Sequence, residues 1–512
     1  MKDLVSEVIG VKVFREYRQD QNFLLPPSLD EFVPEDHEVR IINDVVDAMD
    51  LSLLLDKYEG GGAPAYHPVM MLKVIIYAYS LGVYSSRRIA RELKTDTAFM
   101  FLSGLQCPDF RTICFFRAEH ADVLPELYVE VVRLCASLGM VGLGHIAIDG
   151  TKLRANASLR QSRDRDGLEK EIERIKEQVR QMIQAAAKID EIEDHKSRDG
   201  DSSEVAGELR RKEYRLKRLQ EAKKLLERER LNRVNITDPE SRLMQDNRRA
   251  IQPAYNGQIA VDEKGQVIVA ADVSQDTTDH HQFRGMVEGV EQNLGALPTE
   301  ASADAGYSSY ENLEYAQQKG LDAYMPDDFF EALEKKEQTE KRYHKSNFRY
   351  DQERNVYICP EGRNLRRFQE LKRQGKPPFI IYRGESCRGC AVKMECTRGP
   401  ARRITRDGRE RLVETMREKL RSEEGREIYK KRLYTVEPVM GHMEWNRRKL
   451  MMSLRGLEKV RGEFSLMCLV HNVKKVVKGM LAGSVSLPDK YSGLARMATL
   501  GYREKGTILV PA

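Results

Sequence analysis

Two aspartates stand at matching positions in short apolar segments of the chain. Asp149 closes the segment 144–148 and Asp304 closes the segment 300–303, and a glycine follows each within two residues. Both segments are predicted to be short strands that end at the aspartate. A single aspartate at a strand end is usually a turn former. If the two strands are neighbours in one sheet, however, both carboxylates leave the same edge and can share divalent cations, because Mg²⁺ prefers oxygen ligands.

Glu437 is the candidate for a third carboxylate of the same site. It lies just before the basic segment 445–478, which is predicted to be helical. Three acidic residues in this order, with basic helices behind the last, are harder to explain as separate turn formers. The three positions together favour a metal site.

The charge of the chain is distributed unevenly along its 512 residues. The total is only +5, from 85 basic and 80 acidic residues. Segment 341–411 has 20 Lys and Arg against 8 Asp and Glu, which is +12, and segment 445–478 has 9 against 2, which is +7. The rest of the chain therefore sums to 5 − 19 = −14. This segregation fits a basic surface for a polyanion, and a pair of solvated helical faces is the alternative that charge alone leaves open.

The middle of the chain alternates strand and helix patterns. Segments 255–261 and 267–273 are predicted to form a hairpin, and a helix of about 15 residues follows His280. A helix at 310–319 and a strand at 321–325 continue the alternation. This order predicts a mixed α/β sheet.

The segment 160–233 has a different pattern, with leucine and other apolar residues at alternating steps of three and four. A polar, turn-like stretch at 197–207 divides it, so the pattern predicts a helical hairpin. Its nearly balanced charges are more typical of a solvated coiled-coil face than of a binding site. The apolar positions are Leu168, Ile172, Ile175, Val179, Met182, Leu209, Leu216, Leu219 and Leu226.

Residues 1 to about 140 are predicted to be mostly helical. Short helices beginning near Ser85 and after Asp109 carry basic residues at positions that suit a helix-turn-helix, with ordinary helix packing as the alternative. The basic positions are Arg87, Arg88, Arg91, Lys94, Arg111 and Arg117.

Four of the eight cysteines lie close together in the basic segment. Cys359 is followed by the pair Cys387 and Cys390 and then by Cys396. In a reducing compartment a disulfide framework is not expected, and four thiolates can hold a tetrahedral structural zinc. The spacing from Cys390 to Cys396 is looser than in a usual zinc knuckle, so free cysteines remain the alternative. The other four are interpreted as core residues: Cys107, Cys114, Cys135 and Cys468.

Several other classes of protein are excluded by the sequence. The longest apolar stretch, 69–84, is interrupted by Lys73 and is too short for a membrane span. The N-terminal residues lack the features of a secretory signal, so cytoplasm is the expected location. Neither a nucleotide-binding phosphate loop nor a His-Glu-x-x-His zinc motif is present. The adjacent histidines 280 and 281 are expected at a helix start rather than in a metal site.

Three of these motifs resemble those of DDE-type bacterial insertion-sequence transposases. The segment 148–158 resembles the first-Asp strand of that family, 303–307 resembles the second-Asp strand, and 436–441 is similar to the final-Glu helix, with Tyr429 and Arg432 upstream. The resemblance extends to 237–244, 255–256, 455–464 and the N-terminal helical region.

The resemblance implies a ribonuclease-H-like catalytic core that holds two Mg²⁺ or Mn²⁺ ions. Asp149 would bridge the ions, and Asp304 and Glu437 would each complete one. Such a site hydrolyses DNA strands at terminal inverted repeats and then transfers the 3′-hydroxyl to target DNA. Lys152 and Arg154 are candidate phosphate contacts. The other candidate DNA contacts in the described motifs are Tyr429, Arg432, Arg87, Arg88, Arg91 and Arg111. The partners implied are double-stranded DNA and a second copy of the chain, in a bacterial cytoplasm close to the nucleoid.

Two positions depart from the family pattern. A lysine normally follows the final Glu by seven residues, whereas this chain has Glu444, and Met440 replaces a common Phe. Either Arg447, Arg448 and Lys449 take over the phosphate contact, or this copy is impaired. The rival functions are therefore an inactive or repurposed metal-dependent nuclease and a non-catalytic, DNA-binding coiled-coil regulator.

The expected organisation joins these observations. It comprises an N-terminal helix-turn-helix-like DNA-binding domain (1–140), a first part of the catalytic core (141–159 and 234–330), a helical hairpin insertion (160–233), a basic cysteine-rich module (341–406), the final-Glu helices (407–482) and a C-terminal tail (483–512).

Overall fold

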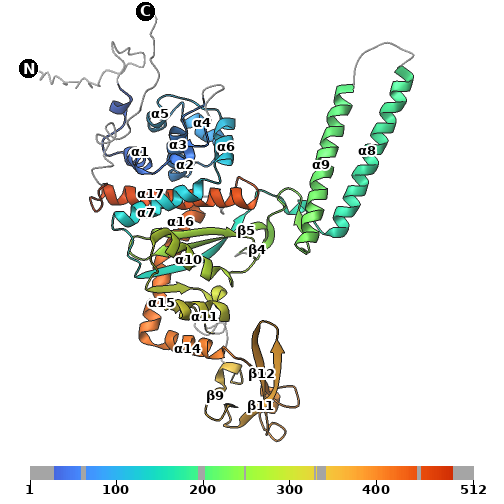
Figure 1. Cartoon of the computed structure of the whole chain (residues 1–512), viewed down its shortest axis with the longest axis vertical. Helices are drawn as coiled ribbons and strands as arrows, with labels where there is room; N and C mark the ends of the chain where they lie inside the picture. Colours follow the sequence, from blue (N-terminus) through green and yellow to red (C-terminus); the bar gives the residue numbers. More distant parts are fainter. Residues whose placement is uncertain are drawn as a thin grey trace, which may run out of the picture.

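The computed structural model describes residues 28–58, 65–193, 202–246, 249–327, 330, 342–446 and 451–487. A central sheet is covered by helices, and a group of short helices stands at one end of the molecule. A small second sheet stands at the other end, and a long helical hairpin projects to the side (Figure 1).

The central sheet has six strands and mixed direction, which confirms the predicted α/β class. Its order is β4-β5-β1-β7-β8, with β6 paired to β5. The pairs β1–β5, β4–β5 and β5–β6 are antiparallel, whereas β1–β7 and β7–β8 are parallel. The strands are β1 (His145–Arg154), β4 (Arg242–Gln245), β5 (Ile251–Asp262), β6 (Ile268–Ser274), β7 (Glu300–Ala303) and β8 (Asp322–Tyr324).

Strand β1 does not end at Asp149, so that prediction is wrong. The strand continues to Arg154 because β5 pairs with it along its whole length, up to the pair Arg154 and Ala254. The pairing with β7 stops earlier, at Ile148 and Ala303. Asp149 therefore lies at the end of a parallel pair and in the middle of an antiparallel one.

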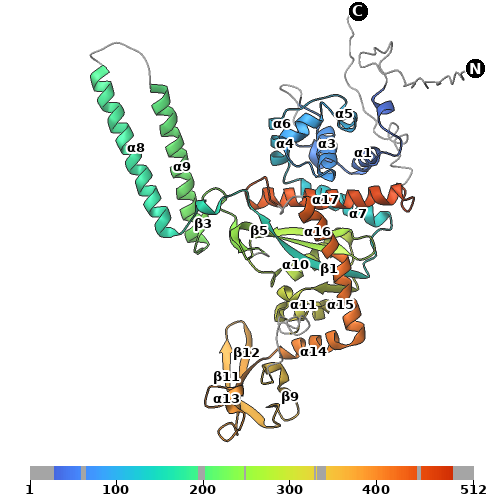
Figure 2. The same cartoon turned by 180° about the vertical axis from the view of Figure 1, so that it is seen from behind.

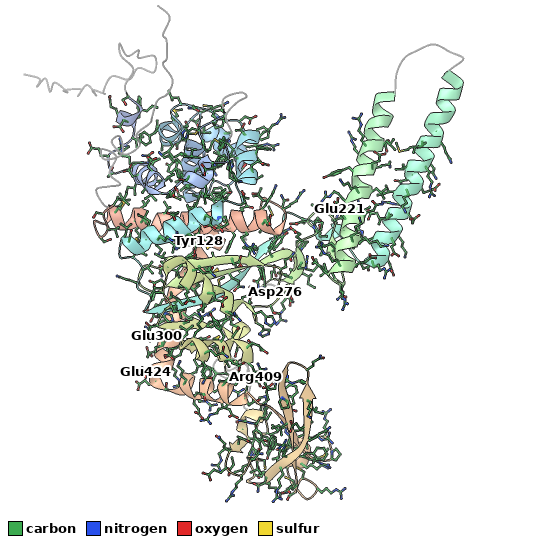
Figure 3. The ribbon with its side chains drawn as sticks, in the orientation of Figure 1. Tyr128, Glu221, Asp276, Glu300, Arg409 and Glu424 are labelled. Carbon is green, nitrogen blue, oxygen red and sulfur yellow. The ribbon has the colours of Figure 1, made fainter. Side chains whose placement is uncertain are left out.

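Two long helices separate the sheet from the N-terminal helices. Helix α17 (Leu457–Leu481) lies beside α7 (Leu124–Ser137), and both views show the pair between the sheet and the helices above it (Figures 1 and 2). More than half of the residues of α17 are buried, and most of these are apolar. Tyr128 of α7 reaches the sheet, where its hydroxyl donates to the carbonyl of Ile268 at 2.8 Å (Figure 3).

The N-terminal helices pack around one apolar helix, α3 (Pro68–Ser80), most of whose residues are buried. Aspartates start two of the surrounding helices, since Asp96 accepts backbone N–H groups of α5 and Asp109 accepts one of α6. The surrounding helices are α1 (Glu38–Ala48), α2 (Ser52–Leu55), α4 (Ser86–Glu92), α5 (Thr97–Ser103) and α6 (Phe110–Glu119), after the short 3-10 helix η1 (Leu29–Phe32).

Arg117 is not presented to solvent, contrary to the sequence prediction. Only 6% of it is exposed. Its guanidinium donates to the Tyr79 hydroxyl at 2.9 Å, the Tyr84 carbonyl at 3.0 Å and the Ser86 hydroxyl at 2.6 Å. Arg117 therefore ties α6 to α3 and α4, whereas Arg111 on the same helix is exposed.

The prediction of four core cysteines is half wrong. Cys135 of α7 and Cys468 of α17 are buried, and burial raises the pKa of the Cys135 thiol to about 12. Cys107, in the loop between α5 and α6, and Cys114 of α6 are exposed.

The helical hairpin consists of α8 (Arg165–Glu193) and α9 (Ser202–Arg228), as its periodicity predicts. A short strand pair, β2 (Ser162–Arg163) with β3 (Val234–Asn235), closes its base. Buried side chains near the base join the two helices: Leu168, Ile172, Ile175, Leu219, Ala222 and Leu226.

A second sheet, which the sequence patterns did not predict, forms most of the basic cysteine-containing segment. It has five antiparallel strands in the order β13-β12-β11-β10-β9. Tyr350, Tyr357 and Tyr382 pack edge to face or at a tilt in its small core. The strands are β9 (Arg349–Asp351), β10 (Val356–Ile358), β11 (Asn364–Arg373), β12 (Lys376–Gly384) and β13 (Arg403–Asp407), with a short helix α13 (Lys393–Cys396).

Three helices lead from this sheet back to the central one. Where they begin, Arg409 pairs with Glu311 at 3.2 Å and with Glu314 at 3.6 Å, both on α11, so it joins the two parts (Figure 3). The connecting helices are α14 (Glu410–Arg421), α15 (Glu423–Thr435) and α16 (Glu437–Asn446); the central sheet also carries α10 (Gln282–Leu294) and α11 (Tyr310–Lys319). Short 3-10 helices occur at η2 (Leu159–Gln161), η3 (Ala305–Tyr307) and η4 (Lys345–Asn347).

Among the described residues, no helix combines the length and apolar character that crossing a membrane requires.

Gly462 provides a test of how α17 docks on the N-terminal helices. A Cβ atom there would stand 1.9 Å from the Ala121 carbonyl oxygen, which is backbone and has little room to move. We expect Gly462→Ala to lower the free energy of unfolding by about 1–3 kcal/mol through overpacking. Gly285→Ala is the matched control, because that helical glycine has no neighbouring atom within 4 Å and alanine should stabilise α10 slightly. Denaturant unfolding of the two variants should give opposite shifts, and equal shifts would contradict the close docking.

Candidate functional site

Asp149 and Asp304 lie side by side at the edge where β7 ends. The last parallel pair of β1 and β7 joins Ile148 to Ala303. Asp149 and Asp304 are the residues that directly follow this pair, one on each of the two neighbouring segments. The condition set in the sequence analysis, that the two strands are neighbours in one sheet, is therefore met. The arrangement needs a parallel connection, which the chain makes through α10 between β6 and β7.

Each aspartate is held by a backbone N–H group just downstream. Gly150 N–H donates to Asp149 Oδ1 at 2.8 Å, and Gly306 N–H donates to Asp304 Oδ1 at 2.9 Å. The same oxygen is engaged in both residues, and in both the Oδ2 atom contacts Arg432. The two carboxylates are therefore oriented before any ligand arrives.

The side chains packed against Gly150 leave no room for a Cβ atom at this position. A Cβ atom at this position would stand 2.5 Å from the Gln258 side-chain nitrogen, 3.0 Å from Asp279 Oδ1 and 3.1 Å from the Tyr307 hydroxyl. A larger residue would displace this hydrogen-bonded group. The glycine after Asp149 thus has a packing explanation as well as a place in the motif.

Arg432 of α15 contacts all three candidate carboxylates. One terminal nitrogen lies 2.9 Å from Asp149 Oδ2 and 3.7 Å from Asp304 Oδ2, and the other lies 3.6 Å from Glu437 Oε1. The exposed fraction of the side chain rises from 17% for Asp149 to 34% for Asp304 and 51% for Glu437. The cluster therefore opens from a buried end at Asp149 toward solvent at Glu437.

Burial controls the electrostatics of the inner end. Burial raises the pKa of Asp149 to about 6; Arg432 opposes this effect, while the carboxylates of Asp304 and Asp279 add to it. The pKa of Arg432 is itself raised, because the three carboxylates outweigh the cost of burying its charge. The three carboxylates carry more negative charge than one guanidinium can neutralise, so the site favours additional positive charge.

Glu437 is placed by a break between two helices. Helix α15 ends at Thr435 and α16 begins with Glu437, so the carboxylate belongs to the first turn of a helix. A negative side chain is favoured there by the helix dipole. Val436 and Val439 beside it are buried and anchor the break to the core.

A fourth carboxylate, Asp279, stands behind the cluster and was missed by the sequence analysis. Its Oδ1 accepts from the Asn256 amide at 2.6 Å and from the Gln258 amide at 2.7 Å, and it lies 3.5 Å from the Lys152 ammonium. The Tyr307 hydroxyl donates in turn to Gln258. The sequence contained one signal for this group. Asn256 and Gln258 are two residues apart on β5, so both amide side chains lie on the same face of the sheet.

The predicted DNA-contacting residues have different environments. The Lys152 ammonium is buried beside Asp279, whereas the Arg154 side chain is exposed. Tyr429 is half-buried one turn before Arg432.

The N-terminal candidates lie away from this cluster. They belong to helices on the other side of α17 from β1 (Figures 1 and 2), and Arg87 and Arg111 both lie over the ring of Phe110. These exposed candidates are Arg87, Arg88, Arg91 and Arg111. Arg447, Arg448 and Lys449 lie outside the described residues, as does the side chain of Glu444.

The donor atoms suit a hard cation, although the guanidinium now stands among them. Within the part of the chain that the structure describes, no three His, Cys, Asp or Glu side chains are arranged to hold a metal ion as they stand. The three carboxylates nevertheless supply only oxygen donors, and two of them present an oxygen to the same guanidinium nitrogen. Several carboxylate oxygens with excess negative charge are ligands of the kind that Mg²⁺ or Mn²⁺ prefers.

The fold and the site define an α/β protein that gathers acidic residues from distant segments at the edge of a mixed sheet. Comparison with protein families gives two matches: the Transposase domain (DUF772) at residues 27–119 and the Transposase DDE domain at residues 358–477. These two matches support a DDE-type insertion-sequence transposase. The second match contains Arg432 and Glu437, and the fold brings Asp149 and Asp304, which lie outside both matches, beside them.

No curated protein is similar enough to the chain to count as a match.

Removal of Arg432 tests whether it holds the cluster together. We expect Arg432→Gln to lower the free energy of unfolding by about 2–3 kcal/mol at neutral pH in the absence of divalent cations, because the inner carboxylates lose their counter-ion. Arg426→Gln is the matched control, since Arg426 is exposed on the same helix and should change stability by less than about 0.5 kcal/mol. Denaturant titrations in a chelator measure both. Equal stability of the two variants would show that the cluster does not depend on this guanidinium.

Proposed function

We propose that the chain is a transposase that binds the terminal inverted repeats of an insertion sequence, hydrolyses the DNA strands at its ends and transfers the 3′-hydroxyl to target DNA. The observation that carries this proposal is the convergence of Asp149, Asp304 and Glu437 on Arg432. Three carboxylates from separate segments of a transposase chain have no evident structural reason to share one guanidinium. A common role in catalysis explains their meeting.

Strand order supports a ribonuclease-H-like core. In the order β6-β5-β1-β7-β8, the pairs β6–β5 and β5–β1 are antiparallel, and β7 and β8 run parallel to β1. The candidate carboxylates then lie on the central strand β1, just beyond its parallel neighbour β7, and on a helix that follows the sheet. This is the layout that the resemblance in sequence leads us to expect.

In this proposal Asp149, Asp304 and Glu437 hold two divalent cations. Bound there, the cations would activate a water or a DNA 3′-hydroxyl and would stabilise charge on the leaving oxygen. The backbone N–H groups of Gly150 and Gly306 fix one oxygen of each aspartate. Arg432 lies against the other oxygen of each aspartate, so it would hold the carboxylates together in the absence of a cation and would have to move away for cations to bind.

The basic segments supply the surface for DNA. On the second sheet, exposed Phe368 lies under Arg383 at 5.0 Å and Arg403 at 5.5 Å. Aromatic and basic groups interleaved in this way suit a nucleic acid backbone. The N-terminal helices would recognise the repeats. Two copies of the chain are expected in the DNA complex, because two ends must be cut and joined, and the protein would act in the cytoplasm.

Cleavage of end-bearing DNA tests the catalytic assignment. With DNA that carries the repeats flanking the reading frame, we expect cleavage only when Mg²⁺ or Mn²⁺ is present. Asp304→Asn and Glu437→Gln should each lower the cleavage rate by at least ~10²–10³-fold. Asp276→Asn is the control, because Asp276 is an exposed carboxylate outside the cluster. Equal cleavage by wild type and Asp304→Asn would end the catalytic proposal, and cleavage without joining of precut ends to a plasmid would favour a nuclease.

The charge distribution predicts how DNA binding responds to salt. If six to ten phosphates are contacted, affinity for end DNA should fall by roughly 10³–10⁵ between 50 and 200 mM salt. Replacing Arg87, Arg88 and Arg91 together by glutamine should reduce the slope of log affinity against log salt by up to about three. Fluorescence anisotropy over a salt series measures both effects. An affinity that hardly changes with salt would refute the assignment of the basic segments to DNA.

A further inference from the structure

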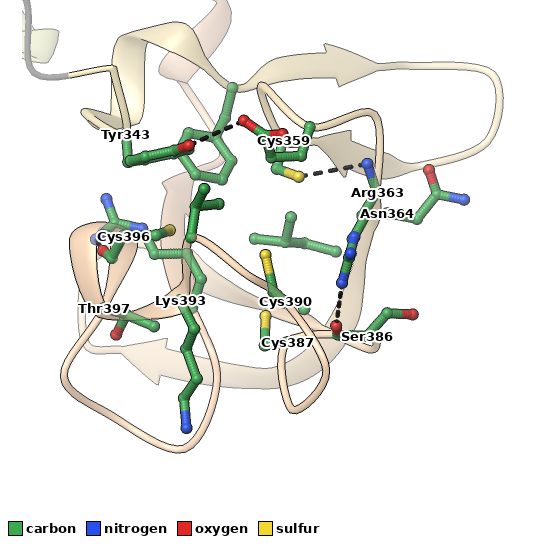
Figure 4. Close-up of a pocket in the computed structure, with 16 residues that line it drawn as sticks. Tyr343, Cys359, Arg363, Asn364, Ser386, Cys387, Cys390, Lys393, Cys396 and Thr397 are labelled. Atoms are coloured by element: carbon green, nitrogen blue, oxygen red, sulfur yellow. Dashed lines mark hydrogen bonds between the residues drawn. The ribbon is translucent and has the colours of Figure 1, made fainter.

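The four clustered cysteines come together around one small space in the second sheet. Cys359 follows β10, Cys387 and Cys390 lie in the loop after β12, and Cys396 ends α13. All four are half-buried free thiols, and all four line a cavity of about 30 Å³ (Figure 4). Three separate stretches of chain thus contribute sulfur to one place.

The turn at Cys359 already directs a backbone donor at its sulfur. The Arg363 N–H donates to Cys359 Sγ at 3.3 Å, and Gly362 N–H donates to the Cys359 carbonyl at 2.8 Å. Backbone N–H groups that point at sulfur orient and stabilise a thiolate ligand. At the second turn, Cys390 N–H donates to the Cys387 carbonyl at 3.3 Å, so that the two residues lie on one tight turn.

The surroundings leave room for the sulfurs and place positively charged side chains beside them. A Cβ atom on Gly384 would stand 2.4 Å from Cys387 Sγ, so the absence of a side chain there creates the space that this sulfur occupies. The cations Arg363, Lys393 and Arg402 also line the cavity.

We propose that Cys359, Cys387, Cys390 and Cys396 form a structural zinc site. Four thiolates and no open position are typical of a closed tetrahedral site, so the metal would hold the fold and would not catalyse a reaction. In this structure the thiols stand along the cavity walls, and no group of three donors in the described residues meets at one point. Binding therefore requires the thiols to turn inward toward the shared space.

The module needs such a link because its own core is small. Six buried residues form that core: Tyr343, Phe348, Tyr357, Leu365, Tyr382 and Ile404. The loop between β12 and β13 contains three of the cysteines and few other buried apolar residues. Small units of this kind usually gain stability from a disulfide or a metal, and the four thiols here are free. Zinc would fix this loop to the turn after β10 and so hold the basic hairpin β11–β12 in place.

Metal analysis of the purified full-length chain tests the site directly. After expression with zinc and purification under reducing conditions without chelator, we expect about one zinc per chain by mass spectrometry of the metal. The double variant Cys387→Ser and Cys390→Ser should lose at least about ninety per cent of it, since two of four ligands are removed. The control Cys107→Ser and Cys114→Ser changes two exposed cysteines outside the module and should keep the full amount.

A second measurement separates zinc loss from misfolding. Limited proteolysis of the native wild-type chain, before and after a strong chelator, should reveal new cleavage confined to the loop between β12 and β13. Three results would overturn the proposal. The wild type could remain free of zinc after reconstitution, the two double variants could contain equal amounts of zinc, or the protein could bind iron in place of zinc. Neither measurement involves DNA, so the result is independent of whether the protein acts as a transposase.

Discussion

The contact of one guanidinium with three carboxylates determines much of the structure around it. Arg432 can reach Asp149, Asp304 and Glu437 only if α15 crosses the end of the parallel pair β1–β7 and a helix break follows within five residues. Like charges gathered in a partly buried site repel one another, so the arrangement needs positive charge among the carboxylates, and Arg432 supplies it in this structure. By the same reasoning, two divalent cations would neutralise the three carboxylates more fully than one guanidinium does.

A second set of contacts fixes the frame on which these groups are mounted. Asp238 accepts from the Tyr255 hydroxyl at 2.8 Å and from Gly456 N–H at 3.2 Å, which joins β5 to the start of α17. The buried carboxylate of Glu463, on α17, accepts from Ser453 N–H at 2.8 Å. The segments 237–244, 255–256 and 455–464 resembled the family although they carry no candidate catalytic residue. Their meeting gives that resemblance a structural explanation, since they hold α17 against the sheet.

The sequence predicted best where a pattern is local or strictly periodic. The alternating strands, the helix 310–319 and the apolar steps that became α8 and α9 all have such patterns. The pairing of β1 with β7 was only a condition for a shared site, because two similar segments do not by themselves determine which strands are neighbours. Arg432 is different, because it lies 283 residues from Asp149 and nothing local indicates their contact. The second sheet was missed because β11, with residues such as Arg366 and Arg367, is too polar and exposed to show an alternating pattern. Asp279 was missed because its partners are amides on another strand, and Arg117 because a buried arginine looks like an exposed one in sequence.

We propose that Asp149, Asp304 and Glu437 form one cation site and that Arg432 moves away when cations bind. Anomalous diffraction from crystals of the protein with end DNA and Mn²⁺ can test this proposal. We expect manganese peaks bounded by these three carboxylates, with the guanidinium no longer bonded to Asp149. Manganese elsewhere, with Arg432 still 2.9 Å from Asp149 Oδ2 as it is here, would rule the proposal out.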